Sequence, residues 1–410
     1  MVGALEGIRV LELTSAMAGP WIGRIMAHCG AEVIRVESQA RPDVVRLYVP
    51  PWNPDLGTQP EMSPWFTEWN AGKRFIALDL TRPAAVELAR RLVAISDVVV
   101  ENFRGGVADR LGLGYAALRT VRPDVIMLSS SGYGASGPSS HYATWGPNLE
   151  ALAGLAAFSG FPERECTVTQ YAYPDAVSAL HGLFAILCAL DHRARTGRGQ
   201  HIDLAQLESL AAVAGPLLLE FLANGREPPR LGNRSRHAAP QGCYRCLGDD
   251  RWCAITVADD AEWARLCDVV GRPGWARDPR FATAAARQAN AEVADALLEE
   301  WTRRRDPYDV MATLQAAGIA AGVVQHAEDL ARRDRQLAAR QFFEEVEHLK
   351  KGRVVATGIP LGLTGTPGHT WRAGAAVGQD NDYVFGTLLG LSTDEVRGYV
   401  DAGAIELGPG

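Results

Sequence analysis

The sequence predicts an α/β protein whose large domain is built on a doubly wound parallel sheet. Three observations support this prediction. Apolar runs of strand length alternate with helix-length segments through the first two hundred residues. Two of the apolar runs end in glycine-bearing loops, as in open sheets that bind ligands at the carboxyl ends of their strands. The length of 410 residues exceeds that of one typical domain, so a second domain is expected.

The first unit of this fold lies at the amino end of the chain. Residues 8–13 and 32–37 are apolar runs typical of buried strands, and residues 21–28 between them read as a helix. This βαβ arrangement predicts parallel strands. Residues 38–66 are rich in Pro, Trp and Asn and have no period, which indicates a long surface loop of the kind that often carries function.

Further strands and helices continue the alternation. The strands are expected at 75–78, 97–100, 125–129 and 201–204, and the helices at 83–95, 176–190 and 206–223. This order predicts helices on both faces of the sheet.

A change of composition then marks a second domain. Residues 225–241 are basic and rich in Pro and Gly, which is typical of a linker or a mobile loop. Strands at 243–247 and 252–257, joined by a Gly-Asp-Asp turn and followed by helices, predict a smaller α+β domain. Beyond it we expect a helix at 327–338, a strand near 342–347 and a last helical pair.

Charge and hydropathy exclude several classes of partner. A net charge of −7 and a pI near 5.8 provide no basic field for nucleic acid or anionic lipid. No segment is expected to cross a membrane, and seven scattered cysteines fit reduced thiols. We therefore expect a cytoplasmic protein without nucleic-acid or membrane partners.

Two short motifs resemble cofactor sites without their required context. Cys243 and Cys246, with Cys253 nearby, lack a second pair of zinc ligands, so buried structural cysteines and no metal site are expected. Gly132 to Gly137 spells G-x-G-x-x-G, but Pro138 follows where a dinucleotide-binding helix would begin. No nucleotide redox cofactor is expected.

Asp175 is the most informative acidic residue. Pro174 precedes it, and from residue 176 to 190 apolar side chains cover every face of the helix, which predicts a buried helix. One interpretation is that Asp175 only caps this helix, a role worth about 1 kcal/mol. The other is that it is a nucleophile beneath backbone N–H donors that can also hold an oxyanion. The residue alone leaves both interpretations open.

Several motifs together resemble the family III CoA-transferases, also called the CaiB/BaiF family. They are L-x-G-I-R-V-L-E-L with Ala18-Gly19-Pro20, G-A-E-V-I-R-V-E (30–37), N-x-G-K-R-x-I-x-L-D-L (70–80), E-N-F-R-x-G-x-x-x-R-L-G-L (101–113), S-G-Y-G-x-S-G-P (131–138) and the Asp175 segment with T-G-R-G-Q-x-I-D-L. They occur in order along essentially the whole chain, which makes the resemblance specific.

The resemblance implies a CoA-binding α/β domain formed by both ends of the chain. The implied boundaries are 1–224 for its first part, 225–325 for the small domain and 326–410 for the segment that returns to the large domain. It also implies a homodimer in which two ring-shaped subunits are interlocked.

The resemblance further implies chemistry at Asp175. In such enzymes the matching aspartate attacks an acyl-CoA, and the reaction proceeds through mixed anhydrides and an aspartyl-CoA thioester to a second carboxylic acid. The residues aligned with CoA contacts are Met17, Ala18, Lys73, Asn102, Phe103 and Arg110. Ser38 stands where the family often has an adenine-packing arginine, so Arg41 or Arg35 would serve instead.

Departures from one branch of the family narrow the expected substrates. Met17 replaces the glutamine of the formyl-CoA branch, and residues 232–237 replace its glycine-rich loop, which disfavours oxalate and formate. The segments 145–150 and 242–250 are closer to the benzylsuccinate-type transferases, which use succinyl-CoA. We therefore expect a succinyl-CoA-dependent transferase.

The main alternative is a 2-methylacyl-CoA racemase, a sister activity of the same family. A racemase needs a second acid/base opposite the aspartate, and that histidine would fall on Trp145, with Gly146 beside it. An indole cannot move the proton. A non-enzymatic CoA-binding protein is the third possibility, and it would show no exchange of CoA between a thioester and a free acid.

Overall fold

The computed structural model describes residues 3–48, 60–169 and 171–408. The chain divides into two compact units. The first unit comprises Met1–Ala156, Val168–Gly225 and Gln336–Gly410, and the second comprises Ala157–Thr167 and Arg226–Arg335. The segment Ala157–Thr167, which the sequence-based boundaries assign to the large domain, thus belongs to the second unit.

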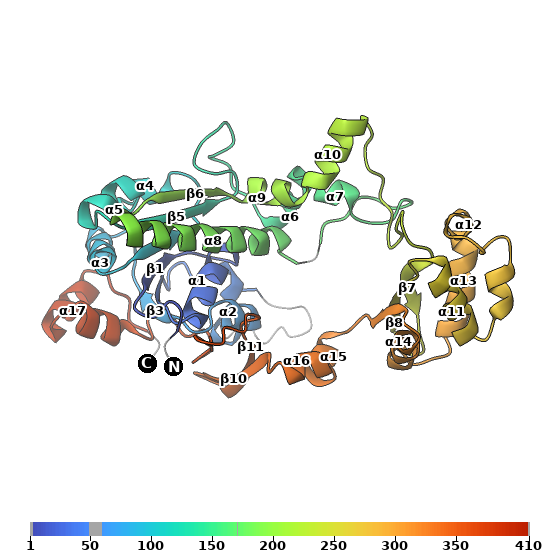
Figure 1. The fold of residues 1–410 in the computed structure, drawn as a ribbon. Coiled ribbons are helices and arrows are strands. Elements are labelled where there is room, and N and C mark those ends of the chain that lie inside the picture. Colours follow the sequence, from blue (N-terminus) through green and yellow to red (C-terminus); the bar gives the residue numbers. More distant parts are fainter. Residues whose placement is uncertain (1–2, 49–59, 170, 409–410) are drawn as a thin grey trace. The chain divides into compact units, whose positions relative to one another are not determined.

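The first unit contains a six-stranded parallel sheet with the order β3-β2-β1-β4-β5-β6 (Figure 1). The strands are β1 Arg9–Leu13, β2 Glu32–Glu37, β3 Arg74–Ala77, β4 Val98–Glu101, β5 Ile126–Ser131 and β6 His201–Ala205. The order reverses between β1 and β4, which pair in parallel with Leu11 opposite Val99. The predicted α/β fold with a parallel sheet is confirmed. Ligands of such sheets bind where the strand order reverses.

Helices cover both faces of this sheet because successive strand residues point to opposite sides. Val10 packs with α1 (Ala18–His28) and α8 (Tyr173–Thr196), whereas Leu11 packs with α3 (Pro83–Ala94). The other helices of the amino-terminal half are η1 Val44–Arg46, η3 Pro60–Met62, α2 Pro64–Trp69, α4 Val107–Arg110, α5 Tyr115–Val121, α6 Gly146–Leu152 and α7 Leu155–Phe158. The 49–59 part of the predicted surface loop lies outside the described residues.

The carboxyl-terminal segment packs on the same core as α3. Val384 and Phe385 of the π-helix η5 (Asp382–Leu388) are fully buried there, and α17 (Thr393–Asp401) adds partly buried side chains (Figure 1). The expected strand near 342–347 is β10 (Phe343–His348), and it pairs with β11 (Gly352–Thr357) in an antiparallel hairpin. The sequence analysis did not predict β11, whose apolar run is only three residues long, from 354 to 356.

The second unit has its own sheet and core. The strands β7 (Gln241–Arg245), β8 (Trp252–Thr256) and β9 (Ala320–Val323) form an antiparallel sheet in that order. The accompanying helices are α11 Asp260–Val269, η4 Pro273–Arg277, α12 Ala284–Ala289, α13 Ala291–Thr302, α14 Pro307–Ala316, α15 Ala327–Arg332 and, at the unit boundary, α16 Arg335–Ala339. Trp263 and Phe281 lie at the centre of the core.

The prediction that α8 is buried on every face is wrong for the single chain. One face packs on α1, β5 and β6, with Ile186 fully buried, but Phe184 on another face is 69% exposed. By length and hydropathy alone α8 could span a membrane. The predicted helix 206–223 is also broken, into α9 (Gln206–Val213) and α10 (Gly215–Asn224), which are bent by 63° where Pro216 cannot continue α9.

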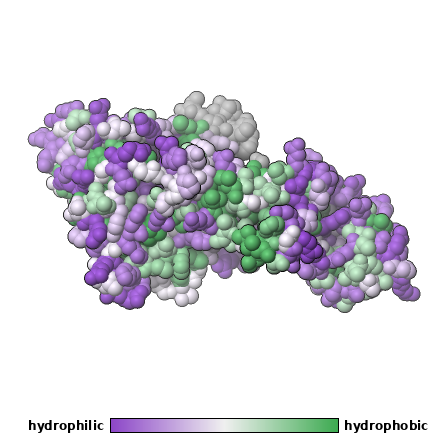
Figure 2. Space-filling model, turned by 90° about the horizontal axis from the view of Figure 1, so that it is seen from above, coloured by the Kyte–Doolittle hydropathy of each residue, from purple (hydrophilic) through white to green (hydrophobic). Residues whose placement is uncertain are grey.

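These helices carry an exposed apolar surface, which we call the α8–α10 surface. It consists of Leu180, Phe184, Leu187, Val213, Leu218, Leu219, Phe221 and Leu222. Figure 2 shows hydrophobic side chains gathered on the molecular surface in the region of α9 and α10. Exposed apolar groups of this extent mark contact sites for other molecules.

Candidate active site

Two adjoining pockets open where the strand order reverses. The larger, of about 460 Å³, lies beside the carboxyl ends of β1, β2 and β3. The smaller, of about 200 Å³, has Asp175 in its wall, and we call it the Asp175 pocket. Ser15 and Phe103 line both, so the two pockets adjoin one another along the loops that follow β1 and β4, and we call them together the groove.

Asp175 lies in the first turn of α8, where Ala172 is the N-cap residue and makes no side-chain cap. The backbone N–H groups of Asp175 itself and of Ala18, the first residue of α1, stabilise the charged carboxylate. The amino ends of two helices therefore meet at one acidic group, and both dipoles favour its charged form. Burial outweighs these interactions and raises the pKa of Asp175 to about 6.

The wall facing Asp175 is formed by the start of α6. A Cβ added to Gly146 would lie 3.1 Å from Oδ2 of Asp175, so only glycine leaves this side of the carboxylate open. Trp145, which precedes it, lines the same pocket and is 61% exposed. Among the described residues that line the Asp175 pocket, Arg104 and Tyr142 are the other ionisable groups. Neither is the carboxylate or imidazole that a second base at neutral pH would require.

Asp43 fixes the conformation of the loop after β1. Ala16 has a φ of +62°, a left-handed conformation that is rare outside glycine, and its N–H donates to both carboxylate oxygens of Asp43 at 3.1 and 3.2 Å. Asn102 holds the neighbouring residue: its side chain accepts from the N–H of Ser15 and donates to the Ser15 carbonyl, both at 2.8 Å. These contacts fix the part of the groove shared by the two pockets.

A buried charge network supports Asp43. Arg35 donates to Asp43 and lies 3.6 Å from Glu12, which also binds Lys73 at 2.9 Å. All four side chains are buried. A Cβ on Gly23 would collide with Glu12, so α1 approaches this network closely.

Lys73 lies in this network and not on the wall of either pocket. Its ammonium donates to Glu12, to the Pro20 carbonyl and to Asn70, and the side chain is fully buried. Burial lowers the pKa of Lys73 to about 7. In this arrangement its three donors are occupied by protein oxygens, and its evident role is to hold α1 against β1 and β3.

The other sequence-predicted residues lie on or near the groove. Phe103 lines both pockets and Asn102 the smaller one, and Arg41 is an exposed residue of the larger pocket. Met17 and Ala18 are buried at the start of α1. The guanidinium of Arg35 is bound to Asp43, which leaves Arg41 as the accessible one of the two arginines.

Arg110 is exposed at the end of α4 and outside both pocket walls. It lies one helical turn beyond Val107, which does line the larger pocket.

Sequence reasoning missed two residues that shape the site. Gln206, the first residue of α9, lines the Asp175 pocket, and its position directly after β6 was an available signal. Asp43 gave no such signal, because it lies in a segment without period.

Comparison with known proteins adds independent findings. The family model described as CoA-transferase family III matches residues 5–381. The chain is 33% identical over 392 residues to the succinyl-CoA–D-citramalate CoA-transferase of Chloroflexus aurantiacus, covering 96% of both chains. It is 30% identical to the succinate–glutarate CoA-transferase of Agrobacterium fabrum, covering 94% of this chain and 95% of that protein. The crystal structure of a CaiB/BaiF family protein from Brucella suis has a TM-score of 0.87 at 31% identity, covering 95% of this chain and all of that one.

Proposed function

The chain belongs to CoA-transferase family III and is a CoA-transferase, and we propose that it moves CoA from succinyl-CoA to an organic acid with Asp175 as the nucleophile. The observation that carries this proposal is the position of Asp175, at the amino ends of α1 and α8 in a pocket that adjoins a larger one. The names of two relatives support succinyl-CoA as the donor.

The proposed reaction has four steps. The Asp175 carboxylate attacks the thioester carbonyl of the donor, the C–S bond breaks, and a mixed anhydride and CoA thiolate form. The thiolate attacks the aspartyl carbonyl, which releases succinate and leaves an aspartyl-CoA thioester. The acceptor carboxylate attacks this thioester and expels the thiolate again. The thiolate then attacks the acceptor carbonyl of the second anhydride, which gives the new acyl-CoA and frees the Asp175 carboxylate.

The chain's own groups would assist these steps at the carbonyl of Asp175. The Ala18 N–H stabilises the charged carboxylate in the resting enzyme and would donate to the oxyanion when that carbonyl is attacked. The pKa near 6 leaves the carboxylate ionised at neutral pH while keeping it more basic than an exposed aspartate. The open space beside Gly146 admits the second reactant.

The dimensions of the groove support one direction for CoA. We propose that the larger pocket takes the nucleotide end, with Arg41 beside the adenine and Arg110 near the phosphates. The pantetheine arm would pass Ser15 and Phe103, the residues shared by the two pockets, and bring the thioester to Asp175. The chain that follows β1 and β4 would form the walls of this path, with Met17, Ala18 and Asn102. Lys73 would stabilise these walls from the protein interior.

The racemase alternative has less support. The position opposite Asp175 that would carry the second base is occupied by Trp145 and Gly146, and the described pocket wall offers no histidine or second carboxylate. A racemase would exchange the α-proton of a 2-methylacyl-CoA in deuterated water. We expect no such exchange at a catalytic rate.

The α8–α10 surface supports the interlocked homodimer. Side chains such as Phe184 and Leu222 would lose their contact with water if a second subunit packed there. Threaded subunits cannot separate without opening a chain, so native mass spectrometry at nanomolar concentration should find dimers, and reversible monomers would contradict this assembly.

The transfer reaction itself is tested with a panel of free acids. Succinyl-CoA would be offered with citramalate, glutarate, oxalate, benzylsuccinate and monocarboxylates, and new thioesters read by mass spectrometry. We expect at least one new acyl-CoA to form with the release of succinate. Hydrolysis of succinyl-CoA without any new thioester would contradict the proposal.

A further inference from the structure

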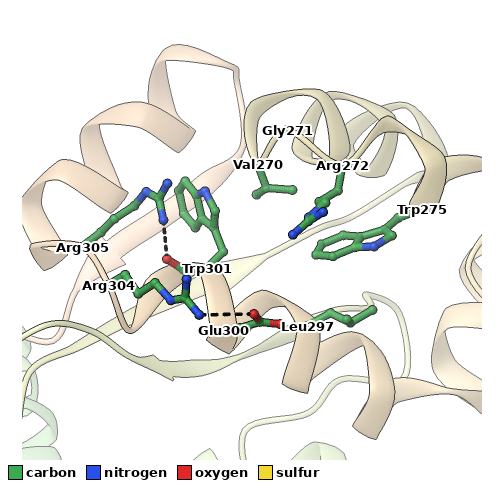
Figure 3. Close-up of a pocket in the computed structure, with 9 residues that line it drawn as sticks. All are labelled: Val270, Gly271, Arg272, Trp275, Leu297, Glu300, Trp301, Arg304 and Arg305. Atoms are coloured by element: carbon green, nitrogen blue, oxygen red, sulfur yellow. Dashed lines mark hydrogen bonds and ion pairs between the residues drawn. The ribbon is translucent and has the colours of Figure 1, made fainter.

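The second unit contains a cavity of about 350 Å³ that is separate from both active-site pockets (Figure 3). It lies between the end of α11, the 3-10 helix η4 and the end of α13. Trp275 and Trp301 contribute two half-buried indole rings, and Val270 and Leu297 add apolar surface. The volume falls at the lower end of the range of small-molecule sites, about 300–1,000 Å³.

The same cavity carries an excess of positive charge. Arg272, Arg304 and Arg305 line it against one carboxylate, Glu300, which pairs with Arg304 at 3.4 Å. Within the described ranges, no carboxylate forms an ion pair with Arg272. A guanidinium without a partner beside apolar walls favours an anion.

The two tryptophans have different surroundings. The guanidinium of Arg305 lies 4.4 Å from the centre of the Trp301 ring and donates to the Trp301 carbonyl at 2.7 Å, so this arginine already has partners. Figure 3 shows Arg305 on one side of Trp301, with Arg272 and Trp275 across the cavity on the other side. The open part of the cavity is thus bounded by two indoles and the guanidinium of Arg272.

We propose that this cavity binds a small aromatic carboxylate. A planar ring packs well against indole surfaces, and the carboxylate pairs with the guanidinium of Arg272 through two parallel hydrogen bonds. The limited volume favours a single ring system over a ligand as large as CoA. This proposal does not depend on the proposed function, because no residue of the cavity belongs to the groove around Asp175.

The test uses the full-length protein and isothermal titration calorimetry with three matched probes. Phenylacetate carries both the ring and the charge, phenylacetamide lacks the charge, and cyclohexylacetate lacks the aromatic ring. We expect phenylacetate to bind at least tenfold more tightly than either of the others. Equal binding of phenylacetamide, or no binding of phenylacetate at millimolar concentration, would overturn the proposal.

Variants then locate the binding event, because the acceptor site could also take a carboxylate. Arg272→Gln removes the charge of an exposed side chain and should weaken phenylacetate binding at this cavity at least tenfold, with CoA transfer unchanged. Arg277→Gln is the matched control: Arg277 is exposed at the end of η4, the 3-10 helix whose N-cap residue is Arg272, and it lies outside the cavity wall. Phenylacetate binding that is the same in both variants would overturn the proposal.

Discussion

The backbone N–H of Ala18 stabilises the charged carboxylate of Asp175, which links the first residue of α1 to the first turn of α8. Two helices that begin 155 residues apart in sequence thus direct their amino ends at one acidic group. Burial still dominates and raises its pKa to about 6. The resulting carboxylate is partly desolvated and ionised at neutral pH, as a nucleophile requires.

The first prediction concerns the pH dependence of turnover. The protonated Asp175 cannot attack a thioester, so kcat/KM for succinyl-CoA should fall about tenfold per pH unit below about pH 6. Initial rates between pH 4.5 and 8, on enzyme checked for folding at each pH, measure this profile. A rate that is constant down to pH 5 would contradict a nucleophile with this pKa.

The second prediction concerns the stability of Asp175→Asn. Folding raises the pKa of Asp175 from 3.8 to about 6, so the charged form costs stability, fully above pH 6 and not at all below pH 3.8. Removing the charge should raise the free energy of unfolding by about 1–3 kcal/mol at pH 8, and by much less at pH 4.5. Urea unfolding of both proteins at the two pH values measures the difference. A variant less stable than wild type at pH 8 would show that the folded protein does not disfavour the charged form of Asp175.

The third prediction tests Asp43 as a residue that positions the groove. In Asp43→Asn, the buried Arg35 loses its nearest carboxylate partner and keeps only the longer contact with Glu12 at 3.6 Å, and the Ala16 loop loses a charged acceptor. We expect a loss of about 3–5 kcal/mol in stability. In the protein that still folds, kcat should fall at least tenfold.

The matched control for Asp43→Asn is Asp124→Asn, which breaks the partly exposed Arg122–Asp124 pair and should cost less than about 1 kcal/mol. Equal effects of the two variants on stability and kcat would contradict the positioning role of Asp43.

The fourth prediction separates Arg110 from Lys73. Arg110→Ala removes an exposed charge near the larger pocket and should raise the KM for succinyl-CoA at least fivefold while kcat changes little. Lys73→Met leaves Glu12 without its ammonium partner, so its main effect should be on thermal stability. An unchanged KM in Arg110→Ala would exclude Arg110 from phosphate binding.

Local sequence patterns were sufficient to predict much of the parallel sheet, but not the burial of the side chains around it. The strand predicted at 32–37 coincides with β2 because its apolar, β-branched run is unambiguous. The exposure of Phe184 was not predictable, because an apolar helix face looks the same whether its own chain or another molecule covers it. The burial of Lys73 depends on Glu12, 61 residues away, a pairing that no local pattern encodes.

In the candidate site, too, some residues could be predicted from the sequence and others could not. Asp175 was found at the start of a predicted helix and Phe103 after a predicted strand, both with the support of the family motifs, and both line the groove. The contact between Asp43 and Ala16 was not predictable. It depends on the left-handed conformation of Ala16, which is unusual for alanine and has no signal in the sequence.

Mass spectrometry of the peptide that contains Asp175, after incubation of the enzyme with succinyl-CoA alone, tests whether Asp175 is the nucleophile. Wild type should carry an acyl or CoA adduct there, which hydroxylamine converts to a hydroxamate. Asp175→Asn should fold, carry no adduct and turn over more slowly by several orders of magnitude, because the amide keeps the size of the side chain but not the nucleophile. Full activity of Asp175→Asn, once reversion to aspartate by deamidation is excluded, would contradict the assignment of Asp175 as the nucleophile.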